Sequence, residues 1–307
     1  HMCAVQMFAR TSPASTQLVA GLISLCNKYG WKQLAILFQD ATSTDAAIFE
    51  SELQDAEVEV GVRARVAFRD SASGALQQIK RKRLRIVLLM AQDATHIRRW
   101  LLDAYDLGMT SKGWAYLCAN VVSVARLTTS TGTWMEGDGR DGDALLAAQG
   151  LVSVVPNPQL SAKFFSLLQR AAQWDAQQRP GHAVAPGRWS DADSVYLAFL
   201  YDALYALVVA ADAEVRATGS AANGTALMDR LLSLPSLDGV AGSIVFGQNG
   251  DSMMPWEGRN VQNSTMVAVY SWEPASGTLL AADDISEPAA EHAECKDALD
   301  EEIQAAS

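Results

Sequence analysis

Apolar and polar positions alternate along the first half of the chain in blocks that predict strands separated by helices. Thr16–Tyr29 places an apolar residue every three or four positions on one helical face, and Gly30 ends that helix. Leu34–Phe38 and Ile86–Ala91 are continuous apolar runs of strand length. Further strands are predicted at Val58–Phe68, Trp114–Cys118 and Leu151–Val155, and further helices at Asp45–Leu53, Ala72–Ile79 and Ala94–Leu107. Strands of this kind between helices indicate a parallel, doubly wound α/β lobe.

After Pro156 the pattern becomes mainly helical. Helices are predicted at Ala162–Ala176, Asp191–Arg216 and Ala222–Leu234, and strands at Ser243–Phe246, Met266–Trp272 and Thr278–Ala281, the last two as a hairpin. The run Ile244–Asp251 (IVFGQNGD) ends in Asn249-Gly250, a pair suited to the positive φ angles of a tight turn. The helix at Asp191–Arg216 is apolar around most of its circumference, so it is expected to be buried against a sheet.

Composition and charge exclude several classes of protein. The 307 residues are 49% apolar and 19% charged, which is typical of a globular chain, and no apolar run is long enough to span a bilayer. Nine acidic residues and one lysine give residues 283–307 a net charge of −8, which leaves −3 of the total −11 for the rest. This balance argues against nucleic acid as a partner. The basic run Lys80–Arg85 is interpreted as a solvated loop rather than a phosphate site.

Candidate catalytic and metal-binding chemistry is sparse. The phosphate loop, the dinucleotide glycine motif, the nucleophile elbow and the zinc-protease motif are all missing, so no cofactor and no enzymatic activity are expected. His96 is interpreted as an exposed polar residue of an arginine-rich helix. Cys26 and Cys118 are expected to be buried thiols, whereas Cys3 and Cys295 could pair with each other or with a partner chain. The isolated group at 292–295 is a poor match to four converging zinc ligands, so no metal site is predicted.

Two further segments bear on location and exposure. The polar, glycine-rich stretch Thr128–Asp143 is expected to be an exposed loop. Asn223-Gly-Thr225 and Asn263-Ser-Thr265 are acceptor sequences for N-glycosylation, so Asn223 and Asn263 are candidate glycosylation sites and hint at a secreted protein.

Four stretches together resemble one protein family. Phe8–Asp40 (FARTSPASTQ…YGWKQLAILFQD), Leu107–Asn120 (LGMTSKGWAYLCAN), Tyr201–Asp212 (YDALYALVVAAD) and Leu237–Asp251 (LDGVAGSIVFGQNGD) are similar, in order and spacing, to motifs of the receptor-family ligand-binding region. This is the type I periplasmic-binding-protein or Venus-flytrap domain of class C G-protein-coupled receptors, natriuretic-peptide receptors and bacterial amino-acid-binding proteins. In that family the Asn-Gly turn ends a strand shortly before the last hinge crossing.

The resemblance implies a two-lobed α/β fold. Residues 9–156 would form lobe 2, 157–262 the C-terminal part of lobe 1, 263–282 strands returning to lobe 2, and 283–307 an acidic tail or linker. In the family about a hundred residues of lobe 1 precede the Arg-Thr segment, which here begins at Arg10. We therefore expect a lobe 1 truncated in its first half, and a chain that is poorly stable or associates through its exposed apolar helix.

The expected ligand site is the edge where parallel strands end. Asp40 and Ser43 follow the first strand, Gln92 and Asp93 follow Ile86–Ala91, and Asn120 follows Trp114–Cys118. Ser15 is added by the resemblance. Relatives that bind α-amino acids have acids where this chain has Ser15 and Asn120, and a Tyr in the loop that here is Asp40–Thr44, so an amino-acid ligand is not supported. Each residue could instead be a helix cap or turn residue.

These observations favour an extracellular module of a membrane receptor, or a periplasmic one in bacteria. It would bind a small polar molecule between two lobes and signal by lobe closure. A dimerisation or interaction module without a ligand, with a homo- or heterodimer partner, is the first alternative, and the solute-binding protein of a transporter is the second. A membrane would be reached only through segments outside these residues.

Overall fold

A computed structural model describes residues 9–12, 15–68, 70–91, 94–118, 136–157, 162–178, 194–262, 265–273 and 277–281. The chain divides into two compact units. Unit 1 contains residues 1–14 and 156–255, and unit 2 contains residues 15–155 and 256–307. This division differs from the expected one in three places, because residues 9–12 and Pro156 belong to unit 1 and the chain returns to unit 2 at Trp256 rather than at 263.

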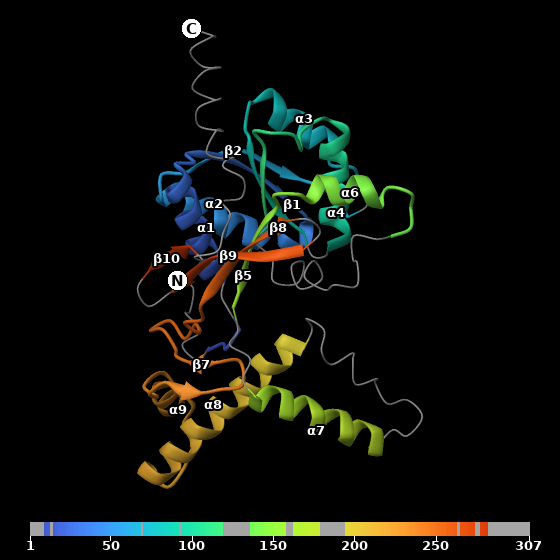
Figure 1. The fold of residues 1–307 in the computed structure, drawn as a ribbon. Coiled ribbons are helices and arrows are strands. Elements are labelled where there is room, and N and C mark those ends of the chain that lie inside the picture. The colour runs from blue at the N-terminus through green and yellow to red at the C-terminus, as the bar shows by residue number, and fades with distance from the viewer. Residues whose placement is uncertain are drawn as a thin grey trace. The chain divides into compact units, whose positions relative to one another are not determined.

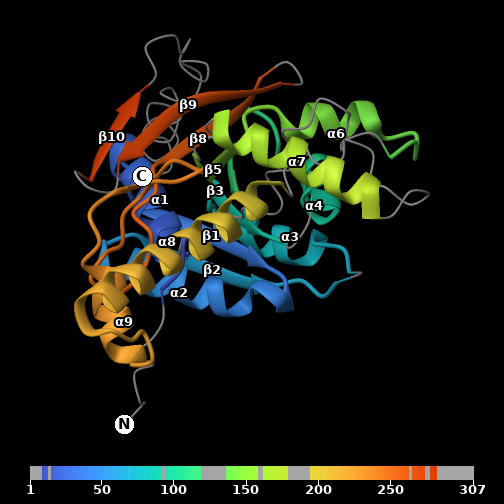
Figure 2. The same cartoon turned by 90° about the horizontal axis from the view of Figure 1, so that it is seen from below.

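Unit 2 is built on an eight-stranded sheet in the order β10-β9-β8-β5-β4-β3-β1-β2, which can be followed in Figure 2. Its first strands are β1 (Gln33–Phe38), β2 (Glu59–Arg65), β3 (Ile86–Met90), β4 (Ala115–Cys118) and β5 (Val152–Pro156). The pairs β1–β2, β1–β3, β3–β4 and β4–β5 are parallel. The mixed α/β architecture confirms the fold class predicted from the sequence.

β3 and the buried part of β1, Leu34–Phe38, are apolar because helices cover both faces of the sheet (Figure 1), whereas the edge strand β2 keeps exposed polar residues. Leu34 and Ile36 of β1 pack with α1 (Ser15–Tyr29) and α2 (Ser43–Asp55). The alternate residues, Ala35 and Leu37, pack with α3 (Ser73–Arg81), α4 (Ala94–Asp106) and α6 (Asp141–Ala148). Successive side chains of a strand point to opposite faces, so one short strand serves two cores.

The remaining strands of this sheet are β8 (Trp256–Gln262), β9 (Thr265–Glu273) and β10 (Thr278–Ala281). β9 pairs antiparallel with both neighbours, and β9 and β10 lie at the positions predicted for a hairpin. β8 was not predicted. It buries the polar residues Glu257 and Asn260, so it lacks the apolar signature of a core strand. The Asn260 side chain donates to the carbonyl of Gly150 at 3.1 Å, which satisfies it inside the sheet.

Unit 1 contains α7 (Ala162–Gln178), α8 (Ser194–Thr218), α9 (Gly224–Leu232) and a two-stranded sheet of β6 (Leu237–Asp238) and β7 (Ser243–Ile244). One cluster joins Phe164 of α7 to Ala198 and Phe199 of α8 and to Val240 and Ala241. A second joins Ala206 and Ala210 of α8 to Leu231 and Ile244.

Helix α8 has two contrasting faces. Ala198, Asp202, Ala206 and Ala210 recur every four residues and are buried within unit 1. Another face leaves large apolar side chains 37–65% exposed: Leu200, Tyr201, Leu204, Tyr205, Leu207, Val208 and Val215. We call these seven residues the α8 face. The predicted apolar circumference is therefore real, and more than half of its large side chains meet solvent within the described part of the chain.

Three local predictions need correction. His96 is not an exposed residue of α4, because only 4% of it is accessible and its ring nitrogen lies 2.6 Å from the carbonyl oxygen of Phe68. The stretch interpreted as a loop to 143 turns helical at Asp141, where two acids occupy the first turn of α6 and interact favourably with the helix dipole. Of the pair Asn249-Gly250, only Gly250 has a positive φ, at 81°.

Candidate functional site

The ends of the parallel strands in unit 2 form one edge of the sheet. Phe38 at the end of β1 lies beside Arg65 of β2 and Met90 of β3, and Leu89 lies beside Cys118 of β4. The residues that follow these strands therefore emerge next to one another. This edge is where open parallel sheets bind ligands.

Thr42 fixes the first loop at this edge. Its hydroxyl donates to the carbonyl oxygens of Met90 (2.8 Å) and Gln39 (3.0 Å), and the Gln39 amide contacts the same hydroxyl at 3.2 Å. The Gln39 amide also donates to the Met90 carbonyl at 3.1 Å. A buried side chain thus joins the turn after β1 to the end of β3. Asp40 begins a short 3-10 turn, Asp40–Thr42, and Ser43 is the first residue of α2, which follows directly.

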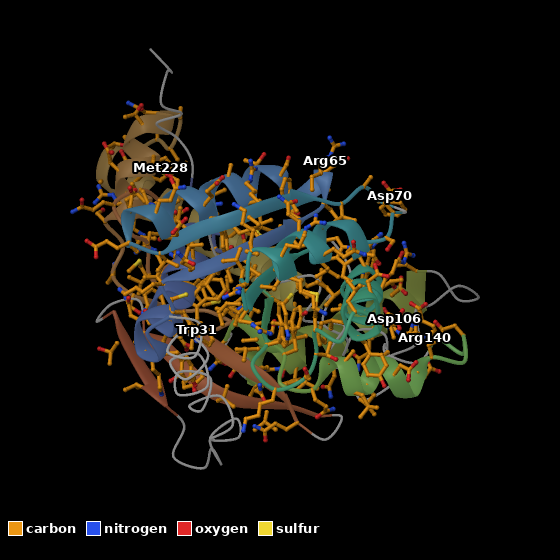
Figure 3. The ribbon with its side chains drawn as sticks, turned by 90° about the horizontal axis from the view of Figure 1, so that it is seen from above. Trp31, Arg65, Asp70, Asp106, Arg140 and Met228 are labelled. Atoms are coloured by element: carbon orange, nitrogen blue, oxygen red, sulfur yellow. The ribbon has the colours of Figure 1, made fainter. Side chains whose placement is uncertain are left out.

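Asp40 is exposed and pairs with Arg65 at the end of β2, whose Nη2 donates to Asp40 Oδ2 at 2.9 Å. Figure 3 shows Arg65 projecting outward at this end of the strand. The hydrogen bond that Arg65 donates to Asp40 is the main cause of a raised pKa of Arg65. Ser43 opens α2, and Arg63 donates to its carbonyl oxygen at 3.3 Å. The described part of the edge therefore carries one carboxylate, two guanidinium groups and a hydroxyl, all in reach of solvent.

The structure describes some of the predicted site residues and not others. Asp40 and Ser43 lie together after β1, as the topology required. Ser15 is the first residue of α1, but its side chain lies outside the description. Gln92, Asp93, Asn120 and Asn263 fall outside the described residues, so their roles stay predictions. Asp40 does not cap the helix, because its carboxylate binds Arg65 instead.

Arg98 anchors residues 136–140, which lead into α6. Its guanidinium is buried and donates to both carboxylate oxygens of Asp138 at 2.8 Å and to Asp141 at 2.9 Å. The hydrogen bond from Arg98 lowers the pKa of Asp138 well below its ordinary value. A neighbouring pair, Arg140 with Asp106, ties the same segment to α4, and Figure 3 shows the two side chains side by side. Residues 136–141 are therefore held firmly against α4.

In unit 1, two of the sequence motifs form one structure. Arg10 pairs with Asp251 at 2.5 Å, its amide donates to the carbonyl of Gly250 at 2.9 Å, and its carbonyl accepts from Ser252 at 3.0 Å. Thr11 donates to the carbonyl of Phe199 in α8 at 2.6 Å. The Asn-Gly-Asp turn therefore holds the Arg-Thr segment in place, although the two lie 241 residues apart. Nothing in the periodicity of either stretch predicts this contact.

Within the described ranges, no group of three or more His, Cys, Asp or Glu side chains could hold a metal ion. No helix in those ranges combines the length and the hydropathy that a membrane span requires. A comparison with curated proteins finds no match. A comparison with protein families matches the receptor family ligand binding region over residues 4–262. Since this match covers most of the chain and includes the four stretches that resemble the family, the chain belongs to the receptor family of ligand-binding regions, with a type I periplasmic-binding-protein-like fold.

Proposed function

We propose that this chain is the extracellular ligand-sensing module of a membrane receptor and not an enzyme. It binds a small polar molecule at the carboxyl edge of β1, β3 and β4, and it signals when its two lobes close on that molecule. The observation that carries the proposal is the fixed turn after β1, where buried Thr42 holds Asp40 and Ser43 at the strand ends. Family membership supports a ligand-binding role for this edge.

The chemistry of the edge favours a ligand with both hydrogen-bonding and charged groups. Asp40 and Arg65 form a pair in which both side chains are more than half exposed, at 56% and 64%. Exposed pairs contribute little to stability, so a ligand can exchange for either partner at small cost. A polar molecule that carries an acceptor for Arg65 and a donor for Asp40 would satisfy both groups at once.

Thermal unfolding against a library of small polar metabolites tests the proposal. A ligand at a hundred times its Kd stabilises the folded state by about 2.7 kcal/mol, which corresponds to a rise in Tm of roughly 5–11 °C for a unit of this size. Asp40→Asn is expected to abolish most of that rise. Glu59→Gln is the matched control, since Glu59 is an exposed acid that pairs with Gln33 at the opposite end of the strands. An equal response of both variants would refute a role for Asp40.

Two other functions remain alternatives. A dimerisation or interaction module of a receptor would show no ligand-dependent shift and a concentration-dependent mass. The solute-binding protein of a transporter would show the shift but would act without a fused effector. The sequence of the whole gene separates the latter from a receptor, since a receptor requires a membrane span and a signalling domain in the same polypeptide.

Extracellular location has its own test at Asn223. The side chain is exposed, and its oxygen accepts from the amides of Thr225 and Ala226 as the cap of α9. The amide nitrogen that would carry a glycan makes neither of these bonds, so capping and glycosylation are compatible. Expression through a secretory pathway should add a glycan to Asn223 that Asn223→Asp removes while it keeps the cap. A secreted chain of unmodified mass would contradict the glycoprotein assignment of this residue.

A further inference from the structure

A groove of about 400 Å³ lies beside α7 in unit 1 and is unrelated to the strand edge of unit 2. Its walls combine two cations, two hydroxyl groups and an apolar surface. The residues that line it are Ala162, Lys163, Ser166, Leu167, Arg170, Tyr201 and Val240. Its volume falls in the range of small-molecule sites.

The groove is preformed because α7 is attached by its opposite side. Phe164 is buried in the cluster with Phe199, and Leu168 packs against that cluster one turn later. Residues 163, 166, 167 and 170 follow a second stripe along the helix, at the spacing that brings side chains onto one face. Burial of one stripe therefore holds the other in a fixed position at the groove.

The facing wall is held by Asp202 of α8. Its two carboxylate oxygens accept from the amides of Val240 (2.7 Å) and Ala241 (2.9 Å), so the turn that contains Val240 is fixed against the helix. Tyr201 precedes Asp202, and its ring stacks on Tyr205 with centroids 6.5 Å apart. Its phenol is partly exposed and lines the groove. An aromatic ring and an aliphatic side chain therefore stand opposite the cations of α7.

The charge of the groove is positive. Lys163 pairs with the exposed Asp238, a contact that a ligand can replace because both side chains are largely solvated. Within the described part of the chain, no hydrogen bond or ion pair involves the side chain of Arg170. The Ser166 hydroxyl donates to the carbonyl of Ala162 at 3.0 Å and keeps acceptor capacity.

We propose that this groove binds a small organic anion with a flat apolar body, of the aromatic carboxylate class. Arg170 and Lys163 would bind the carboxylate, and Leu167, Val240 and the Tyr201 ring would cover the apolar body. A metal ion finds no cluster of carboxylates in this lining, and an inorganic anion would leave the apolar wall unused. A cation would be repelled by the two basic side chains.

Titration of the whole chain with benzoate, followed by amide NMR, tests the proposal, with benzamide as the neutral probe of the same shape. Benzoate should perturb the amides of residues 162–170, 201 and 240, and benzamide should bind roughly fivefold more weakly, as expected for the loss of a charge contact in a partly open site. Arg170→Gln should weaken benzoate by a similar factor. Arg216→Gln is the control, since Arg216 is an exposed cation of α8 outside the groove.

Three kinds of result would overturn the proposal. Equal binding of benzoate and benzamide, or an unchanged affinity in Arg170→Gln, would overturn the role of the cations. Perturbations confined to Leu204 and Val208 would assign the probe to the α8 face and overturn the groove. Perturbations near Asp40 alone would also overturn the groove, and they would support the strand-edge site instead. The groove and the strand-edge site can therefore be refuted independently.

Discussion

The α8 face makes a sharp prediction about association. Leu204 and Val208 lie one turn apart at its centre and are 57% and 65% exposed. We expect the chain to self-associate through this face, and Leu204→Glu with Val208→Glu to shift it toward monomer. Glutamate is a good helix former, and both positions point away from the buried stripe, so the double variant should fold.

The expected change in the Kd of self-association follows from the exposed fractions of these two side chains. Full burial of a Leu or Val side chain is worth about 1.5–3 kcal/mol, so completing the burial of each of these two contributes about 1–2 kcal/mol. A symmetric contact uses both residues from both copies, and its loss would raise the Kd of association by about a thousandfold or more. Facing carboxylates would add repulsion.

Sedimentation velocity over a range of concentrations measures the effect. Leu146→Glu on α6 is the matched control, because Leu146 is 59% exposed but lies in unit 2. The control should associate like the unmodified chain, and the double variant should not. A monomeric 33.0 kDa species that melts sharply without any substitution would refute the reasoning.

Three further predictions concern single residues. Gly239→Ala should destabilise unit 1 by about 1–3 kcal/mol in urea unfolding, because a Cβ at that position would lie 2.6–2.7 Å from the Asp202 carboxylate. Its counterpart is Gly74→Ala in α3, where a Cβ would meet nothing within 4 Å, so this substitution should stabilise the helix by about 0.5–1 kcal/mol. Burial raises the pKa of Cys26 to about 12, so its thiolate is scarce below that pH and a thiol reagent at pH 8 should label it only after unfolding; fast labelling of the native chain would contradict this. Asn120→Asp should move the binding of an α-amino acid from millimolar toward micromolar in calorimetry, by placing a charge opposite the ammonium; tight binding by the unmodified chain would show that Asn120 was misinterpreted.

The sequence predicted the centre of the parallel sheet well, because a strand buried on both faces must be apolar, and β3 and the buried part of β1, Leu34–Phe38, are apolar at every position. It did not predict β8, whose residues Glu257 and Asn260 are polar and yet buried. Glu257 pairs with Arg259 on the same strand, and Asn260 binds the carbonyl of Gly150 on another segment. A partner on another segment depends on the assembled sheet, and periodicity within one segment carries no information about it.

At the candidate site, too, some residues could be placed from the sequence and others depend on contacts that form only in the folded sheet. Asp40 and Ser43 could be placed because residues after parallel strands must share an edge. Thr42 could not, since its role depends on the carbonyl of Met90, 48 residues away. Arg65 left a weaker signal, because a base in the last part of one predicted strand and an acid that follows the neighbouring strand can be expected to pair. The cysteines were simpler, because Cys26 lies on an apolar helix face and Cys118 ends an apolar strand, and both are buried.

The contact between Arg10 and Asp251 has a consequence for biosynthesis. At roughly 5–20 residues per second, a ribosome needs about 10–50 s to make the chain between two residues that lie 241 positions apart. During that interval residues 15–155 are synthesised, and Arg10 cannot form its ion pair because Asp251 has not yet been made. Unit 1 can therefore be completed only after translation has passed the Asn-Gly-Asp turn.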